Sequence, residues 1–242
     1  MGGRRAVRPE ILDALAPADP RAMRSRRDLR LVNRVIGSCG ILTKSLRRVL
    51  ASHPRGTPIR LLELGAGDGS LSSRIARHLA TSWPAAELTL LDRQAVVNSS
   101  TGTALALCGW TLRSLTLDVF EWARTATAQR AAARWDVILV NLFLHHFEDD
   151  RLRELLSAVA TRCDAFIACE PCRSRTALRG ARLLPVLGVS RDTRYDAVVS
   201  VRAGFRDGEL SRLWPAVPGW RLQERPARLF SHLFVAARAE VA

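Results

Sequence analysis

An apolar segment followed by three alternating glycines constrains the fold of this chain more than any other feature. Residues 61–71 read Leu-Leu-Glu-Leu-Gly-Ala-Gly-Asp-Gly-Ser-Leu, and apolar residues at helical spacing continue from there to Leu79. Strand, glycine turn and helix is the arrangement by which a parallel α/β sheet brings its backbone close to a nucleotide. Glycine allows this approach because it has no Cβ.

The spacing of the next residues narrows the kind of nucleotide. A dinucleotide fingerprint would place glycine or alanine at position 70, and the chain has Ser70. The next expected strand, 87–92, ends in Asp92, ~20 residues beyond the glycines. A carboxylate there can accept hydrogen bonds from both ribose hydroxyls. The alternative is an ordinary strand–helix turn with a solvated aspartate.

Glu63 and the three glycines together resemble motif I of the class I S-adenosylmethionine-dependent methyltransferases, and the chain is most similar to the small-molecule type. The resemblance implies an enzyme with S-adenosylmethionine as cofactor. It places Glu63, Gly65 and Gly67 along the methionine part and Asp92 at the ribose. It also implies Asp118 and Val119, with Phe120, beside the adenine, and Asn141 at the cofactor's amino group. Asp118 has an alternative role as the N-cap of the following helix.

Strands and helices alternate from residue 59 onward, which predicts a parallel sheet with helices on both faces. The expected strands are 59–64, 87–92, 111–117, 136–141 and 165–170, followed by 220–224 and 231–237. The expected helices between them are about 70–81, 95–109, 121–133 and 149–161, and a short one at 209–214. Residues 173–206 are arginine-rich and show no clear strand alternation.

The predicted fold is a three-layer, Rossmann-like methyltransferase sandwich. The resemblance implies a seven-stranded, mostly parallel sheet with an antiparallel last strand beside the fifth. Residues 1–57 read as an N-terminal helical cap, with a short helix at 11–15 that Pro17 and Pro20 end and two further helices, and 58–242 as the methyltransferase domain.

Two adjacent histidines follow the fourth expected strand, in the segment Asn141-Leu-Phe-Leu-His145-His146. Histidine is the side chain best suited to accept a proton near neutral pH, so His145 and His146 are the candidate catalytic residues. Two alternatives stand beside this. One histidine could hydrogen-bond the start of the next helix, and methyl transfer can proceed by positioning alone.

The candidate acceptor-binding residues lie in two segments. Asn33 and Gly37, four residues apart, share a face of an N-terminal helix that resembles the cofactor-covering helix of small-molecule methyltransferases. Arg194 and Tyr195 lie in the polar region after the fifth strand, as do Arg173 and Arg202. The alternatives are an ordinary packing helix and a solvated surface. His232 reads as a core or edge histidine.

Composition limits the other classes of function. The net charge is +14, but Lys44 is the only lysine and the arginines are spread along the chain, which indicates compositional bias. An RNA or protein methyltransferase is the alternative that this charge supports, and a non-catalytic cofactor-binding protein is a third. No apolar run is long enough to span a membrane and no secretory signal is evident.

The five cysteines are scattered, which argues against a disulfide scaffold and favours a cytoplasmic protein. Cys169 and Cys172 match C-x-x-C, a pattern of redox or zinc sites, but no second ligand pair accompanies them. The sequence therefore predicts no metal. We expect a small-molecule acceptor as partner, and a monomer or homodimer.

Overall fold

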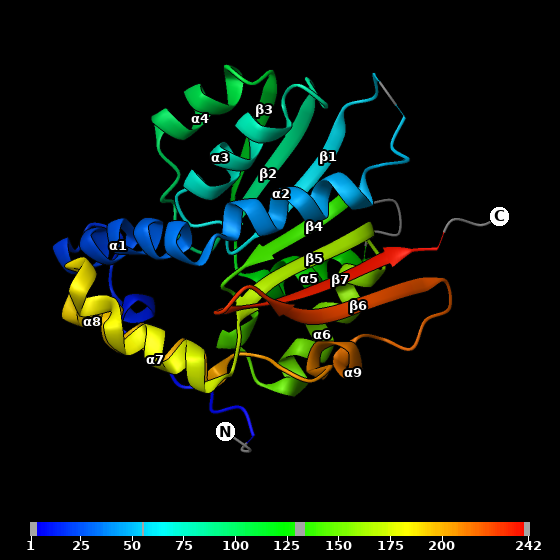
Figure 1. Ribbon diagram of the computed structural model, residues 1–242. Helices are drawn as coiled ribbons and strands as arrows, with labels where there is room; N and C mark the ends of the chain where they lie inside the picture. The colour runs from blue at the N-terminus through cyan, green and yellow to red at the C-terminus, as the bar shows by residue number, and fades with distance from the viewer. Residues whose placement is uncertain (1–3, 55, 129–133, 240–242) are drawn as a thin grey trace.

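A seven-stranded sheet forms the centre of the computed structural model, which describes residues 4–54, 56–128 and 134–239 (Figure 1). Its strands are β1 (Ile59–Leu64), β2 (Ala86–Asp92), β3 (Trp110–Thr116), β4 (Trp135–Asn141), β5 (Cys163–Pro171), β6 (Trp220–Ala227) and β7 (Ser231–Arg238). The strand order is β3-β2-β1-β4-β5-β7-β6. β7 runs in the direction opposite to that of the other six strands. The predicted sheet is therefore confirmed, with β7 beside β5.

Helices cover both faces of this sheet, as Figure 1 shows. One layer contains α2 (Ser38–Val49), α3 (Ser70–Leu79) and α4 (Ser99–Ala106), and the other α5 (Val119–Ala128), α6 (Asp149–Ala160) and α9 (Glu209–Leu213). Two separate apolar cores result, because successive strand residues point to opposite faces. Leu61 packs in one core and Leu62 in the other. This burial on both sides explains why the central strands read as continuous apolar runs.

A third group of helices lies beyond one end of the strands: α1 (Pro20–Ile36), α7 (Arg175–Leu183) and α8 (Arg191–Ala203). We call these three helices the cap, which differs from the predicted N-terminal cap of residues 1–57 because it also contains α7 and α8. Three short 3₁₀ turns accompany it: η1 (Leu12–Ala14), η2 (Leu144–His146) and η3 (Leu184–Leu187). The cap thus joins an N-terminal helix to two helices from the region after β5. By contrast, α2 packs on the sheet through Leu42 and Leu46. The division of the chain at residue 57 stays a prediction.

Helix boundaries differ from the expected ones where capping side chains set them. Pro20 begins α1 instead of ending a helix, because Asp19 accepts a hydrogen bond from Arg21 N at 2.7 Å and proline fits the first helical position. Asn98 caps α4 in the same way, so that helix begins later than expected. Residues 129–133 of the expected helix 121–133 lie outside the described residues.

Helices α7 and α8 are the elements that the sequence pattern did not predict. Each begins with a serine N-cap, Ser174 and Ser190, whose hydroxyl accepts from a backbone N–H three residues on. None of the helices in the described part of the chain is long and apolar enough to cross a membrane.

Candidate active site

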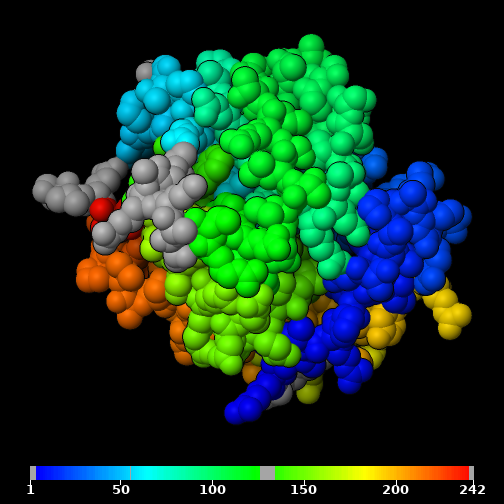
Figure 2. Space-filling view, turned by 180° about the vertical axis from the view of Figure 1, so that it is seen from behind, coloured from blue at the N-terminus to red at the C-terminus, as the bar shows by residue number. Residues whose placement is uncertain are grey.

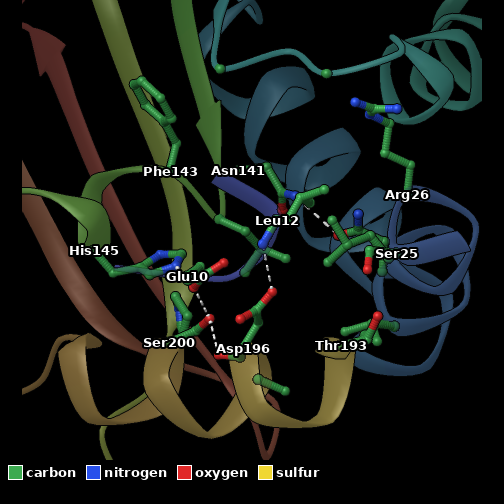
Figure 3. A pocket seen from close by; sticks show the side chains of 18 of the residues that line it. Glu10, Leu12, Ser25, Arg26, Asn141, Phe143, His145, Thr193, Asp196 and Ser200 are labelled. Atoms are coloured by element: carbon green, nitrogen blue, oxygen red, sulfur yellow. Dashed lines mark hydrogen bonds and ion pairs between the residues drawn. The ribbon is translucent and has the colours of Figure 1, made fainter. Parts of the chain in front are cut away.

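A cavity of about 670 Å³ lies between the carboxyl ends of the central strands and the cap (Figure 3). The site residues predicted from the sequence that line it are Glu63, Gly65, Gly67, Asp92, Asp118, Val119, Asn141, Asn33, His145 and His146. Arg194 and Tyr195 are not among its lining residues. The topology brings the first group together because the carboxyl ends of parallel strands meet at one edge of a sheet.

The glycine loop after β1 forms one wall of the cavity. Gly65, Gly67 and Gly69 all have positive φ, between +56° and +72°, a conformation that L side chains rarely adopt. A Cβ on Gly65 would lie 2.2 Å from the Phe143 ring, whereas a Cβ on Gly67 would have no atom within 4 Å. Gly67 N donates to Asp92 Oδ2 at 2.8 Å, which ties this loop to the end of β2. The loop therefore leaves open space directly over its backbone.

Glu63, the last but one residue of β1, is buried with 3% of its surface exposed. Its Oε2 accepts a short hydrogen bond from the Ser72 hydroxyl. Burial, together with the nearby carboxylates of Asp68 and Asp92, raises the pKa of Glu63 to about 7. A cationic ligand in the cavity would favour the ionised form of this group.

Asn141 ends β4 and carries an unsatisfied acceptor. Its Nδ2 donates to Asn33 Oδ1 at 3.0 Å, which joins β4 to α1. Its Oδ1 is buried and has no hydrogen-bond partner among the described residues. A buried polar atom without a partner costs free energy, so such an atom in a cavity wall indicates a ligand that donates to it.

One aspartate ends β2 and another lies just after β3. Asp92 Oδ1 accepts from Gln94 N at 2.9 Å. Asp118 Oδ1 accepts from Phe120 N at 2.8 Å, so Asp118 caps the following helix as the alternative interpretation held. Both carboxylates still line the cavity, as does Val119. Phe120 does not line it; its ring packs edge-on against Phe147 at 5.0 Å.

His145 is buried between two carboxylates. Its Nδ1 lies 2.8 Å from Glu170 Oε2. Its Nε2 lies 3.2 Å from Glu10 Oε1, and Figure 3 shows these two side chains next to each other. Burial disfavours the protonated ring, but the hydrogen bonds to Glu10 and Glu170 outweigh it and raise the pKa of His145 to about 9. An imidazole that already holds its proton at neutral pH cannot take another. The geometry therefore argues against His145 as a general base.

His146 has a different environment. Its Nδ1 lies 3.0 Å from Asp13 Oδ2, and 20% of its side chain is exposed. No residue of the described ranges hydrogen-bonds its Nε2, and the ring lines the cavity. Of the two predicted catalytic histidines, His146 keeps a nitrogen for an incoming acceptor.

Glu10, His145 and His146 place possible metal-ligand atoms within 4.8 Å of one another. Both ring nitrogens of His145, however, already face carboxylate oxygens. A metal would have to displace the proton that joins these groups, so we interpret the cluster as a buried ion-pair network.

A segment near the N-terminus forms part of the cavity wall through Glu10, Leu12 and Asp13. We call residues 5–16 the strap. Ile11 N and Leu12 N donate to the Asp196 carboxylate of α8 at 2.7 and 3.2 Å. Asp13 pairs with Arg93 at 3.0 Å, and Ser200 donates a short hydrogen bond to Glu10. The sequence did not indicate these contacts, because each one joins segments that lie far apart along the chain.

Helix α8 presents to the cavity a face that the sequence did not identify. The predicted Tyr195 is 49% exposed. Thr193, Asp196, Ala197 and Ser200, at helical spacing, line the cavity instead. Burial raises the pKa of Asp196 to about 6, although the strap's N–H groups lower it. The acceptor-binding role of Arg194 and Tyr195 stays a prediction.

Other candidates from the sequence lie away from the cavity. Arg173 is buried and pairs with Glu209 at 2.5 Å. His232 is a buried core residue whose Nε2 lies 2.7 Å from Glu224. Cys169 and Cys172 are free, and burial raises the pKa of Cys169 to about 12, so its thiol is unreactive at neutral pH.

The chain matches no protein-family model, and no curated protein sequence matches it. Solved structures are similar in fold. The plantazolicin methyltransferase BpumL in complex with SAH has 13% identity over 91% of both chains, with a TM-score of 0.63. The CurJ carbon methyltransferase has 19% identity, covering 94% of this chain and 62% of its own, with a TM-score of 0.57.

A third similar structure is the magnesium protoporphyrin IX methyltransferase of Synechocystis with bound SAM. It has 12% identity over 95% of this chain and 88% of its own, with a TM-score of 0.51. The chain thus has the Rossmann-like fold of S-adenosylmethionine-dependent methyltransferases.

Proposed function

We propose that this protein transfers a methyl group from S-adenosylmethionine to a small-molecule acceptor bound under the cap. The observation that carries the proposal is the open glycine loop facing an unsatisfied Asn141 Oδ1 and a buried Glu63. These groups fit a ligand that carries an ammonium and a sulfonium. The methyltransferases of similar fold support the same cofactor.

The residues that would hold the cofactor follow from the cavity wall. Asn141 Oδ1 and Glu63 would accept from the amino group, and Asp92 from the ribose hydroxyls. Asp118 and Val119 would flank the adenine. The bound cofactor supplies an electrophilic methyl group. The protein's own part is to align the acceptor with that methyl and to exclude water, and the strap and the cap, which cover part of the cavity, would serve both purposes.

A natural-product acceptor methylated on oxygen or carbon is the substrate class we propose. Its support is the mainly apolar cavity under the cap and the names of the similar structures, which include a plantazolicin methyltransferase and a carbon methyltransferase. Calorimetry with S-adenosylhomocysteine tests the cofactor assignment directly. Micromolar binding is expected; no binding at millimolar ligand would refute it.

Cofactor affinity is expected to rise with pH because of Glu63. The pKa of about 7 means that Glu63 is largely protonated at pH 6, and pairing with the ammonium group of the ligand needs Glu63 ionised. Linkage then tightens S-adenosylhomocysteine binding about tenfold between pH 6 and pH 8. In the free protein the sign is opposite: the raised pKa makes folding less favourable as pH rises from about 4.5 to 7. Calorimetry at several pH values measures the effect.

The matched control is Glu63→Gln, which keeps the shape of the side chain but removes its ionisable carboxyl group. Its affinity is expected to be independent of pH over this range. If the affinity of Glu63→Gln for S-adenosylhomocysteine still rose about tenfold between pH 6 and pH 8, another titratable group would be responsible for the pH dependence.

Substitution of His146 by glutamine is expected to lower turnover by at least 10-fold while the Kd for S-adenosylhomocysteine changes less than threefold. The reason is that a positioned proton acceptor contributes about 10²–10⁴ to the rate, whereas His146 is not among the groups assigned to the cofactor. Single-turnover rates of the wild type and His146→Gln with an acceptor that the wild type methylates measure this effect. Equal rates for both proteins would mean that transfer proceeds without this base.

A further inference from the structure

Three large apolar side chains are exposed together where α7 passes into η3. Leu183 is 64% exposed, Val186 83% and Leu187 44%. We call these three residues the apolar tip. In Figure 2 the yellow chain of this region projects from the molecule beside the blue N-terminal segments. Leucine and valine gathered on a projecting turn are costly in water, so this group indicates a partner.

The apolar tip is continuous with the cavity. Its three residues also line the cavity, and so does Val35, the exposed residue near the end of α1. The tip therefore surrounds an opening whose inner wall is formed by Ala181, Leu184 and other apolar side chains. A molecule could pass from this rim into the cavity without leaving apolar surroundings.

Positive charge lies next to the tip. Arg175, Arg179 and Arg182 stand on the outer side of α7 and are exposed, whereas Ala177 and Ala181 face inward. The arginines recur at helical spacing, which places them on one face. None of the three forms an ion pair with any residue in the described ranges. Exposed Arg34 adjoins Val35 on α1.

We propose that the apolar tip and these arginines dock on an anionic lipid bilayer. Leu183, Val186 and Leu187 would enter the boundary between headgroups and acyl chains, and the arginines would contact lipid phosphates. Basic side chains flanking an exposed apolar edge are the composition of helices that lie in this boundary. A nucleic acid would engage the arginines but would leave the leucines and valine exposed.

Docking in this orientation turns the opening of the cavity toward the membrane. If the proposed function holds, a lipid-soluble acceptor reaches the active site from the bilayer. The docking itself does not depend on the methyl transfer, so the two can fail separately.

Co-sedimentation of the full chain with vesicles tests the proposal. At physiological salt we expect the protein to bind vesicles of phosphatidylcholine that contain about 30–40% phosphatidylglycerol. The partition coefficient for these vesicles should be at least about tenfold higher than for phosphatidylcholine alone. The double variant Leu183→Asp/Val186→Asp is expected to lose at least tenfold in partition. Arg179→Glu/Arg182→Glu should lose a similar factor, and high salt should weaken binding by the wild type.

Two controls match these variants. Leu107→Asp changes an 85% exposed leucine at the end of α4, and Arg113→Glu an exposed arginine on the edge strand β3; neither residue lines the cavity. Both should bind vesicles as the wild type does. Thermal unfolding checks that every variant is folded. If the double variant Leu183→Asp/Val186→Asp does not fold, the single variant Val186→Asp, at the most exposed residue of the tip, is tested in its place.

Three results would overturn the proposal. The first is no binding to anionic vesicles. The second is a folded tip variant that partitions like the wild type, because charge alone would then explain the binding. The third is binding to single-stranded RNA that the arginine substitutions abolish, in the absence of vesicle binding, which would identify a nucleic-acid surface.

Discussion

Replacing Gly67 with arginine is expected to raise the Kd for S-adenosylhomocysteine at least ~100-fold and to leave the protein folded. A Cβ at this position meets no atom within 4 Å, so the new side chain has room in the structure. That room is the part of the cavity assigned to the cofactor. The left-handed backbone, with φ of +56°, adds a strain of about 1–2 kcal/mol. Strain of this size lowers the Tm of a domain this long by about 2–8 °C.

The matched control is Gly219→Arg. Gly219 also has positive φ and open space around its Cβ position, but it precedes β6 and does not line the cavity. The two variants should lose similar stability, and only the first should lose the cofactor. Calorimetry and thermal unfolding separate the two effects. Full affinity in a folded Gly67→Arg protein would place the ligand elsewhere.

The second large effect is expected on stability, from Glu170→Ala. Glu170 is fully buried and accepts hydrogen bonds from Phe143 N, Leu144 N and His145 Nδ1, at 2.8–3.0 Å. Alanine leaves these donors without a partner and leaves His145 with only the Glu10 carboxylate. Removing one member of a buried ion pair costs about 3–5 kcal/mol, which corresponds to a fall in Tm on the order of 10 °C.

The pH dependence identifies the cause. The raised pKa of His145 gives stability that is fully present below about 6.5 and is lost as pH rises through about 9. The difference in Tm between the wild type and Glu170→Ala should therefore narrow between pH 7 and pH 9.5. Glu121→Ala, an exposed carboxylate at the start of α5, serves as control and should change stability by less than about 0.5 kcal/mol. A constant difference across this pH range would contradict the role of the imidazolium.

Local patterns along the chain sufficed to predict the sheet and the cavity-lining residues that we propose for the cofactor. The strand–glycine–helix segment depends on residues that are close in sequence, and Asp92 and Asn141 follow apolar strands that are easy to recognise. The parallel topology then brings their ends together without further information.

The acceptor end could not be predicted in the same way. Helices α7 and α8 mix arginine with small apolar residues, so no periodicity of large side chains marks them. The partners of His145 lie on the strap and near the end of β5, and only the folded chain brings both carboxylates within hydrogen-bond distance of its ring. A His-His pair in sequence indicates possible chemistry, but burial between two carboxylates argues against a proton-accepting role for His145.

The strap also has a consequence for biosynthesis. Its contacts are with Arg93 after β2, with the histidines of η2 and with Asp196 and Ser200 of α8, all of which leave the ribosome much later than the strap itself. The contacts between the strap and α8 can therefore form only after translation has passed residue 200, so the strap stays undocked from that helix during most of synthesis.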